Sequence, residues 1–274
     1  MQFKSILLLN IVLILIFNTK HLSAQDFQGK AYYFSKSKMN LGRWGARMSE
    51  AQKKRVNNRL KNRLEKTYIL DFNTTESLFI EEEKVDAISG ATDTWGTNFS
   101  RGKQYKNILE NKLVQAQEFY GKRFLVVDEL QTIKWEMGNE VKQIGDYTCF
   151  KATAIVPEKE LSWYNFSWNQ LQSNTTTNTN EPDIKLTQIE AWYTLQIPVR
   201  NGPAEFWGLP GLILEVSMEN TTILCSQIIM NPNDRSKIKA PEKGELINKS
   251  DYRATVIEKM SEMRNSYGRR RSRG

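Results

Sequence analysis

The sequence predicts an α+β domain built on one large, mostly antiparallel and curved β-sheet of about ten strands, near the upper size of strongly twisted open sheets. Three observations support this fold class. Runs of β-forming residues recur at roughly ten-residue spacings, which is typical of an antiparallel sheet. Helical periodicity is confined to a basic N-terminal segment, 41–66, and a C-terminal segment, 251–265. Between them, 191–218 holds two strand-like runs joined by an apolar loop.

The expected strands are short and separated by turn residues. They lie at 29–35, 68–72, 77–80, 104–109, 112–119, 123–128, 132–137, 140–144, 147–156, 192–197, 212–216 and 222–230. Gly145-Asp146 predicts a hairpin turn between two of these runs, and Pro157 ends the second of them. A Gly/Ser/Thr-rich stretch at 86–102 and a basic linker at 233–245 are expected to be loops.

The N-terminal helix is expected to be basic and only weakly anchored. Its apolar residues Met48, Val56, Leu60 and Leu64 form a narrow stripe, and lysine and arginine fill the other faces. Such a helix either lies on anionic lipid or an acidic partner, or crosses one edge of the sheet as a solvated helix. The apolar face lacks the Trp and Phe of an interfacial helix, which favours the solvated alternative.

The C-terminal helix is expected to begin after the capping residue Ser250 and to end at Asn265. Its apolar residues should face the sheet, and they are Tyr252, Val256, Ile257 and Met260. The arginine-rich tail at 266–274 is expected to be disordered.

The apolar loop within 191–218 is the most informative stretch of the chain. Asn201-Gly202-Pro203 is a turn signal, and Gly208–Gly211 predicts a type II turn in which Gly211 supplies the positive φ after Pro210. This loop carries large apolar side chains, namely Phe206, Trp207, Leu209 and Leu212. It therefore either plugs the protein's own core or docks a hydrophobic partner. The rarity of exposed apolar patches favours the plug.

The first residues predict export. Lys4 precedes an apolar run at 6–17, and Ala24 offers a cleavage site, so residues 1–24 resemble a secretory signal peptide. The remainder is expected to form a single domain at 25–265, without a transmembrane segment after signal cleavage. We expect the protein in the periplasm or outer cell envelope, or secreted, with its oligomeric state left open.

The amino-acid composition removes most enzyme classes. The single histidine, His21, lies within the predicted signal peptide. Serine and cysteine nucleophiles that need an imidazole base, and zinc sites with histidine ligands, are therefore not expected. Glu190, Glu205 and Glu215 surround the apolar loop and could act as paired carboxylates, but only their spacing suggests it. The prediction is a protein without catalytic residues, metal or cofactor.

Two further features leave alternatives open. Cys149 and Cys225 could form one disulfide after export, or remain two buried thiols. Four aromatic residues open the segment 163–183, and its tail is a polar loop by composition. The aromatic group could be a stacking platform for a sugar or base, or a hydrophobic corner over the sheet, which is the favoured alternative.

Several motifs together resemble the GLPGLI family. The similar residues are Gly208–Ile213, Ile144–Ala152, Ala191–Tyr193, Ile197-Pro198, Gly202-Pro203, Glu76–Phe79 and Asn231-Pro232. The family is one of small exported proteins of the Bacteroidetes type without an established biochemical function. The resemblance implies that a binding surface would include the motif residues, which are Trp192, Gly202, Pro203, Phe206, Trp207, Gly208, Leu209, Pro210, Gly211, Leu212 and Ile213.

Two functions are therefore expected. The first is a cell-envelope binding or interaction protein with an envelope protein as its partner. The second is a periplasmic carrier that holds a lipid or another hydrophobic ligand in an apolar groove under the sheet. Removal of residues 1–24 takes away Lys4 and Lys20 and lowers the net charge from +8 to +6, a mild excess that does not specify nucleic acid as a partner.

Overall fold

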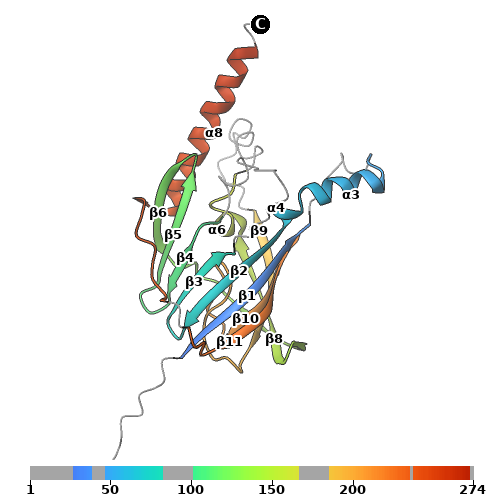
Figure 1. Ribbon diagram of the computed structural model, residues 1–274, viewed down its shortest axis with the longest axis vertical. Coiled ribbons are helices and arrows are strands. Elements are labelled where there is room, and N and C mark those ends of the chain that lie inside the picture. Colours follow the sequence, from blue (N-terminus) through green and yellow to red (C-terminus); the bar gives the residue numbers. More distant parts are fainter. Residues whose placement is uncertain (1–26, 39–46, 83–100, 167–184, 235–236, 272–274) are drawn as a thin grey trace, which may run out of the picture.

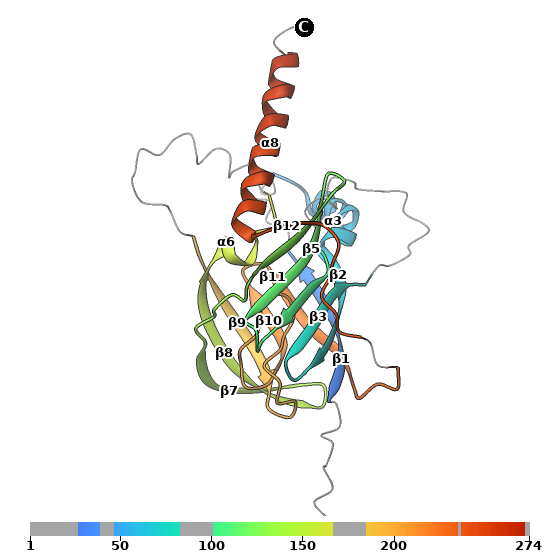
Figure 2. The same ribbon diagram turned by 90° about the vertical axis from the view of Figure 1, so that its left-hand side faces the viewer.

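A computed structural model describes residues 27–38, 47–82, 101–166, 185–234 and 237–271. The predicted signal peptide, most of the predicted loop at 86–102, the polar loop at 167–184 and residues 272–274 lie outside the described residues. The described chain forms one open, curved sheet with few helices (Figures 1 and 2). The prediction of a large, mostly antiparallel and curved sheet is confirmed.

The sheet has 12 strands in the order β12-β6-β5-β4-β3-β2-β1-β11-β10-β9-β8-β7. Their bounds are β1 (Gln28–Ser37), β2 (Glu65–Asn73), β3 (Glu76–Glu81), β4 (Gln104–Asn107), β5 (Lys112–Phe119), β6 (Lys122–Glu129), β7 (Glu136–Ile144), β8 (Tyr147–Pro157), β9 (Leu186–Thr194), β10 (Leu212–Met218), β11 (Thr221–Met230) and β12 (Glu245–Ile247). Every pair is antiparallel except β12 with β6. Strand β1 lies mid-sheet, paired with β2 on one side and β11 on the other.

Alternation of side chains decides which face of the sheet is buried. In β1, Ala31 and Tyr33 are fully buried, whereas Lys30 and Tyr32 are partly exposed. The buried residues of β1 join those of β2, β3 and β8–β11 in the main hydrophobic core. We call the side of the sheet that carries this core the inner face and the opposite side the outer face.

The predicted turn between β7 and β8 is present. Gly145 has φ 56°, a conformation that glycine adopts without steric penalty, and Ile144 pairs with Tyr147 across the two-residue loop. The predicted strand at 132–137 is wrong for most of its length. Only its last two residues join β7, which begins at Glu136, and the indole of Trp135 instead donates to the carbonyl of Trp207.

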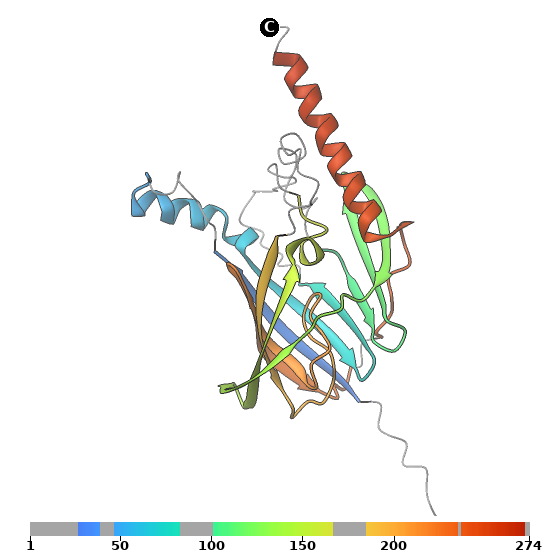
Figure 3. The ribbon, with the colours of Figure 1, turned by 180° about the vertical axis from the view of Figure 1, so that it is seen from behind.

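Helices make up a minor part of the fold, as Figure 3 shows from behind. They are α3 (Glu50–Arg59), α4 (Lys61–Leu64), α6 (Glu158–Leu161) and α8 (Lys249–Arg271). Helix α8 packs on the inner face of β6 through Tyr252, Val256 and Met260, which form a second core with Trp163 and Phe124. It continues past Asn265, where the sequence predicts its end.

The linker after β11 covers part of the outer face. Ile238 and Ala240 pack against a small cluster formed by Tyr105, Val114 and Leu125. The chain then adds β12 beside β6. The sequence did not predict this strand, because three residues are too few to show an alternating pattern.

Candidate functional site: a polar centre beneath the apolar loop

The connection between β9 and β10 folds back onto the inner face as a plug. We use the name plug for residues 195–211. Phe206 and Leu209 are fully buried within it, and Leu212 and Ile213 at the start of β10 are fully buried too. The tyrosine hydroxyl of Tyr33 donates to the carbonyl of Ile213 over 2.7 Å. Of the two alternatives for this loop, the structure shows the core plug.

Trp207 marks the edge of the plug and is only partly buried. Its indole N–H donates to the carbonyl of Gln131 over 2.8 Å, and its own carbonyl accepts from the indole of Trp135 over 2.9 Å. Arg200 lies 5.9 Å from its ring centroid. The rim of the plug is therefore held by directional contacts to the segment that precedes β7.

The glycines of the motif act differently from the prediction. Gly208 has φ 96°, so the left-handed conformation occurs there, whereas Gly211 does not have a positive φ. A Cβ at Gly211 would collide with the backbone carbonyl of Thr194 on β9. A Cβ at Gly202 would lie 2.8 Å from Cδ1 of Ile213. The predicted role of Gly211 in a type II turn is wrong, because glycine is needed there for close packing of two backbone segments.

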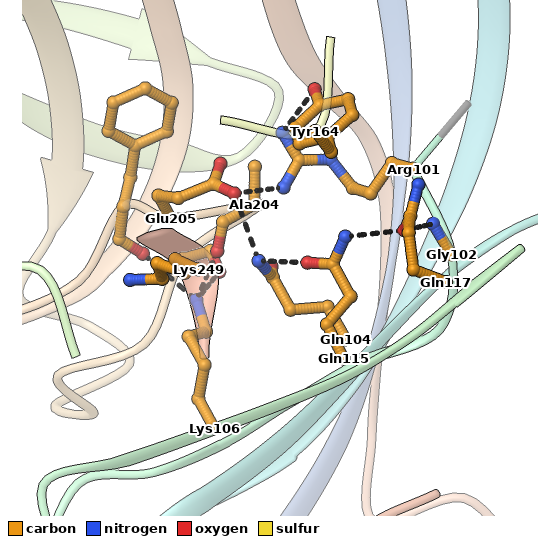
Figure 4. Close-up of polar contacts among 12 residues, drawn as sticks. Arg101, Gly102, Gln104, Lys106, Gln115, Gln117, Tyr164, Ala204, Glu205 and Lys249 are labelled. Carbon is orange, nitrogen blue, oxygen red and sulfur yellow. Dashed lines mark hydrogen bonds and ion pairs between the residues drawn. The ribbon is translucent and has the colours of Figure 1, made fainter. Parts of the chain in front are cut away.

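A buried lysine anchors the plug to the sheet. Lys106 on β4 is fully buried, and its Nζ donates to the carbonyls of Gly202, Ala204 and Phe206 over 2.7, 2.8 and 3.1 Å. An ammonium group has three N–H donors, so these three carbonyl oxygens use its full donor capacity. The backbone of the plug thus forms a cage around a positive charge (Figure 4).

A buried ion pair lies beside this cage. Nη1 of Arg101 contacts Oε1 of Glu205 at 2.6 Å, and the two side chains are only 7% and 2% exposed. Nη2 of Arg101 donates to the hydroxyl of Tyr164 over 2.9 Å, and the guanidinium lies 4.7 Å from the centroid of that ring. A pair of opposite charges buried together avoids the penalty of one isolated buried charge.

Three glutamines extend the polar contacts along β4 and β5. Nε2 of Gln104 donates to Glu205 over 3.1 Å and to Gln115 over 3.0 Å. Nε2 of Gln115 donates to Gln117 over 2.9 Å, and Gln117 accepts from the backbone N–H of Gly102 over 3.0 Å. Figure 4 shows this row running from Glu205 towards the start of β4. We call Arg101, Lys106, Glu205, Tyr164 and the three glutamines the polar centre.

The pKa values of Lys106 and Arg101 depend on the burial of these two side chains and on the charges around them, including that of Glu205. Burial lowers the pKa of Lys106 to about 7, although the negative charge of Glu205 opposes the shift and that of Arg101 adds to it. Burial also acts to lower the pKa of Arg101, but Glu205, Tyr164 and Tyr68 together outweigh burial and raise it above its usual value. Arg101 therefore stays charged as the partner of Glu205, whereas Lys106 can exchange its proton near neutral pH.

The three candidate carboxylates each pair with a different cation. Glu205 belongs to the polar centre, whereas Glu215 pairs with Lys142 at 2.7 Å and Glu190 with Lys151 at 3.0 Å. Glu190 also accepts from the indole of Trp192, which Lys142 faces at 4.3 Å from the ring centroid. Each carboxylate is thus bound to its own cation. Among the described residues, no cluster of three His, Cys, Asp or Glu side chains could hold a metal ion.

The two cysteines are separate buried thiols. Cys149 on β8 and Cys225 on β11 are both free. Burial raises the pKa of the Cys149 thiol to about 11 and that of Cys225 to about 12, so both are protonated at neutral pH. Each thiol donates to a backbone carbonyl, Cys149 to Tyr147 and Cys225 to Gln227, and a disulfide between them after export stays a prediction.

The aromatic residues at the start of 163–183 contribute to two different parts of the structure, the second core and the polar centre. Trp163 packs edge-on against Tyr252 in the second core, at 5.6 Å between ring centroids, and Tyr164 belongs to the polar centre. Phe166 packs partly buried beside them. These three residues therefore form part of the protein's own packing, as the favoured alternative expects, and Trp168 lies outside the described residues.

Sequence reasoning missed most of the polar centre. Polar residues at Gln104, Lys106, Gln115 and Gln117 alternate along two predicted strands, which is the pattern of a solvated face. The signal that could have corrected this is that Tyr105 and Val114 lie on the opposite face, while Leu113 lies on the same face as Gln115 and Gln117, so both faces carry apolar residues. Strands with apolar residues on both faces are covered on both sides.

Comparisons with known proteins give a partial family match and distant structural matches. Residues 135–215, which include the plug, match the model of a family described as a protein of unknown function (Porph_ging). No curated protein matches the sequence. Two solved structures, those of PNGF-II in the C2 and P21 space groups, align with 84% of this chain at a TM-score of 0.48 and 14% identity. The aligned part spans 32% and 33% of those chains, so this chain corresponds to about a third of their length.

Among the described residues, none of the helices is both long enough and apolar enough to span a membrane.

Proposed function

We propose that the protein is an exported interaction protein of the cell envelope without catalytic activity. The observation that carries this proposal is the internal pairing of the polar centre. Its charges and its glutamines bind one another or the backbone of the plug, at distances of 2.6 to 3.1 Å. General acid–base catalysis needs a titrating group that can reach a substrate. The buried groups instead hold the plug in place.

We also propose that the chain is a GLPGLI protein of the Bacteroidetes type. The six motif residues Gly208–Ile213 lie within the matched stretch, 135–215. The packing contacts of Gly202 and Gly211 support a structural reason for this motif, because each glycine lies where a side chain would collide. Its residues then specify how the plug packs rather than what it binds.

The contact surface that we propose is the edge strand β7. It is the last strand of the sheet, so one side of its backbone faces no strand among the described residues. Met137 and Val141 are 56% and 55% exposed, although both are large and apolar. An exposed strand edge offers unpaired N–H and C=O groups to a second chain, and apolar side chains beside it add contact area.

A photo-crosslinking residue placed at Val141 tests this surface in living cells. We expect it to capture one envelope protein in stoichiometric amount. Leu224 on β11 is the matched control, because it is also apolar and 38% exposed but lies in the middle of the sheet. Equal capture from both positions, or capture from neither, contradicts the proposal.

The alternative function is a carrier of a hydrophobic ligand. The curved sheet and the apolar plug favour it, because a plug that left the inner face would uncover Phe79, Leu70 and the other core residues beneath it. Native mass spectrometry of protein purified from its own envelope separates the two functions. A bound lipid supports the carrier, a co-purifying protein supports the interaction protein, and a bare monomer counts against both.

A further inference from the structure

The positive charge of the chain is concentrated in two helical segments. From Glu50 to Leu64, covering α3 and α4, there are six lysines and arginines and one glutamate. Helix α8, Lys249–Arg271, has seven basic and three acidic residues. The two segments therefore carry net charges of +5 and +4, which together exceed the +8 of the whole chain. The remaining chain, with the whole sheet, has almost no net charge.

Both helices extend from the same end of the sheet. Figure 1 shows α8 extending upward past the strands and α3 pointing sideways from the upper ends of β1 and β2, and Figure 3 shows the same from behind. Helix α8 is packed as far as Met263, and Arg264, Asn265 and Ser266 are exposed. The expectation that the N-terminal helix crosses an edge of the sheet does not fit, since α3 packs against α4, and α4 against β1 and β2.

Helix α3 has little to stabilise it alone. It has ten residues, and isolated helices shorter than about 12 to 15 residues are marginal in water. The capping box of Ser49 with Gln52 and the ion pair of Lys53 with Glu50 support its first turn. Its second half presents exposed Arg55 and Arg59, like charges one turn apart that destabilise a helix.

An anionic surface would remove this repulsion. It would also suit the apolar side of the helix, where Val56 and Leu60 are only half-buried beside the exposed cations. A lipid surface accepts both kinds of side chain, because apolar residues enter the boundary region while lysine and arginine contact the head groups. A nucleic acid or an acidic protein segment would accept the charges but leave the apolar stripe in water.

We propose that α3 and α8 dock this end of the molecule onto an anionic lipid surface, with the sheet and its β7 edge held above it. The proposal adds a lipid partner to the proposed interaction function and uses different residues. The failure of one therefore does not imply the failure of the other.

Vesicle flotation tests the proposal with the processed protein purified from its host. We expect binding to phosphatidylcholine vesicles that contain phosphatidylglycerol, little binding to phosphatidylcholine alone, and release by added salt. The variant K54Q/R55Q/R59Q should bind the anionic vesicles about 100-fold more weakly, because each cation near such a surface contributes about 1 kcal/mol. Glutamine keeps the helix propensity close to that of lysine and arginine.

The matched control is K237Q/K239Q/K243Q, which removes three exposed lysines from the linker after β11. It should retain vesicle binding within about twofold, because its charges do not lie on α3 or α8. Equal losses in both variants would show a general charge effect and overturn the proposal. Tighter binding to double-stranded DNA or to a polyglutamate peptide than to anionic vesicles would also overturn it. Circular dichroism of both variants confirms that the fold is retained.

Discussion

Lys106 and the lysines of α3 show two opposite environments for the same side chain. Lys106 is fully buried, and three backbone carbonyls and a nearby carboxylate compensate its charge. Lys54 on α3 is exposed, with Arg55 beside it, in a helix whose main packing partner is the short α4. A buried charge must be compensated within the fold, because desolvation makes an isolated one very unfavourable. An exposed charge has no such requirement and remains available to a partner.

This difference predicts that the buried charges of the inner face control stability and the exposed charges of α3 do not. The largest effect should come from G211A, because a Cβ would collide with the carbonyl of Thr194 and separate the plug from β9. We expect a loss of at least about 4 kcal/mol in the free energy of unfolding, or no folded protein.

The control for that variant is G208A. Its Cβ would meet only the indole of Trp135, at 3.8 Å, so the positive φ is its main penalty. It should lose about 1 to 2 kcal/mol. Urea unfolding followed by tryptophan fluorescence measures the loss of unfolding free energy in both variants. A smaller loss in G211A than in G208A would contradict the close-packing role of Gly211.

The next largest effect should come from E205Q. The change removes the charge that compensates Arg101, which is buried and stays protonated. We expect the free energy of unfolding to fall by about 3 kcal/mol, as for other buried pairs that lose one partner. E215Q is the matched control, since it breaks the more exposed pair with Lys142 and should lose less than about 1 kcal/mol. Equal losses of unfolding free energy in E205Q and E215Q would show that burial does not determine how much each ion pair contributes to stability.

Lys106 should make stability depend on pH. Its pKa is lowered to about 7 in the folded protein and returns to its ordinary, higher value on unfolding. Above pH 7 the unfolded chain therefore binds more protons at this site than the native protein, so this contribution to stability rises with pH. Between pH 7 and 8.5 the gain should be about 1.5 kcal/mol.

The comparison protein for this measurement is K106M, which has a similar side-chain volume and does not titrate. The difference between wild type and K106M isolates the lysine from all other titrating groups. K106M should also be less stable at every pH within this window, because it leaves three buried carbonyls without a donor. A difference that stays constant between pH 7 and 8.5 would show that Lys106 does not exchange its proton in this range.

The smallest effect should come from the α3 variant K54Q/R55Q/R59Q. All three side chains are exposed. The free energy of unfolding should therefore change by less than about 0.5 kcal/mol, although three charges are removed. A loss comparable to that of E205Q would mean that the exposed charges of α3 contribute to the stability of the fold, and the contrast with the buried charges would fail.

The sheet was largely predictable because local patterns encode it. Alternating residues and turn signals placed most strands close to their observed positions, as at Gly145 between β7 and β8. The plug was favoured because Phe206 and Leu209 are too apolar for a solvated loop. The short strand β12 was missed, as was the continuation of β7 from Glu136, where a bulge between Met137 and Val141 interrupts the alternation.

The polar centre was not predictable in the same way. Tyr164 and Glu205 lie 63 and 104 residues after Arg101 in the chain, so no local sequence pattern relates the three. Lys106 resembles any strand lysine until the plug is placed above it. A long-range contact between polar groups depends on where the sheet curves and which loop returns to it.

The sequence by itself therefore determined that this chain forms a large antiparallel sheet with an apolar loop that needs cover, because side-chain periodicity and hydrophobicity are local properties. Only the tertiary structure decided that this loop is held by a caged lysine and a buried ion pair. It also decided that the positive charge of the chain gathers at one end of the sheet. Both depend on folding distant segments together, since the burial of a charge and the sum of a surface charge exist only once the chain is packed.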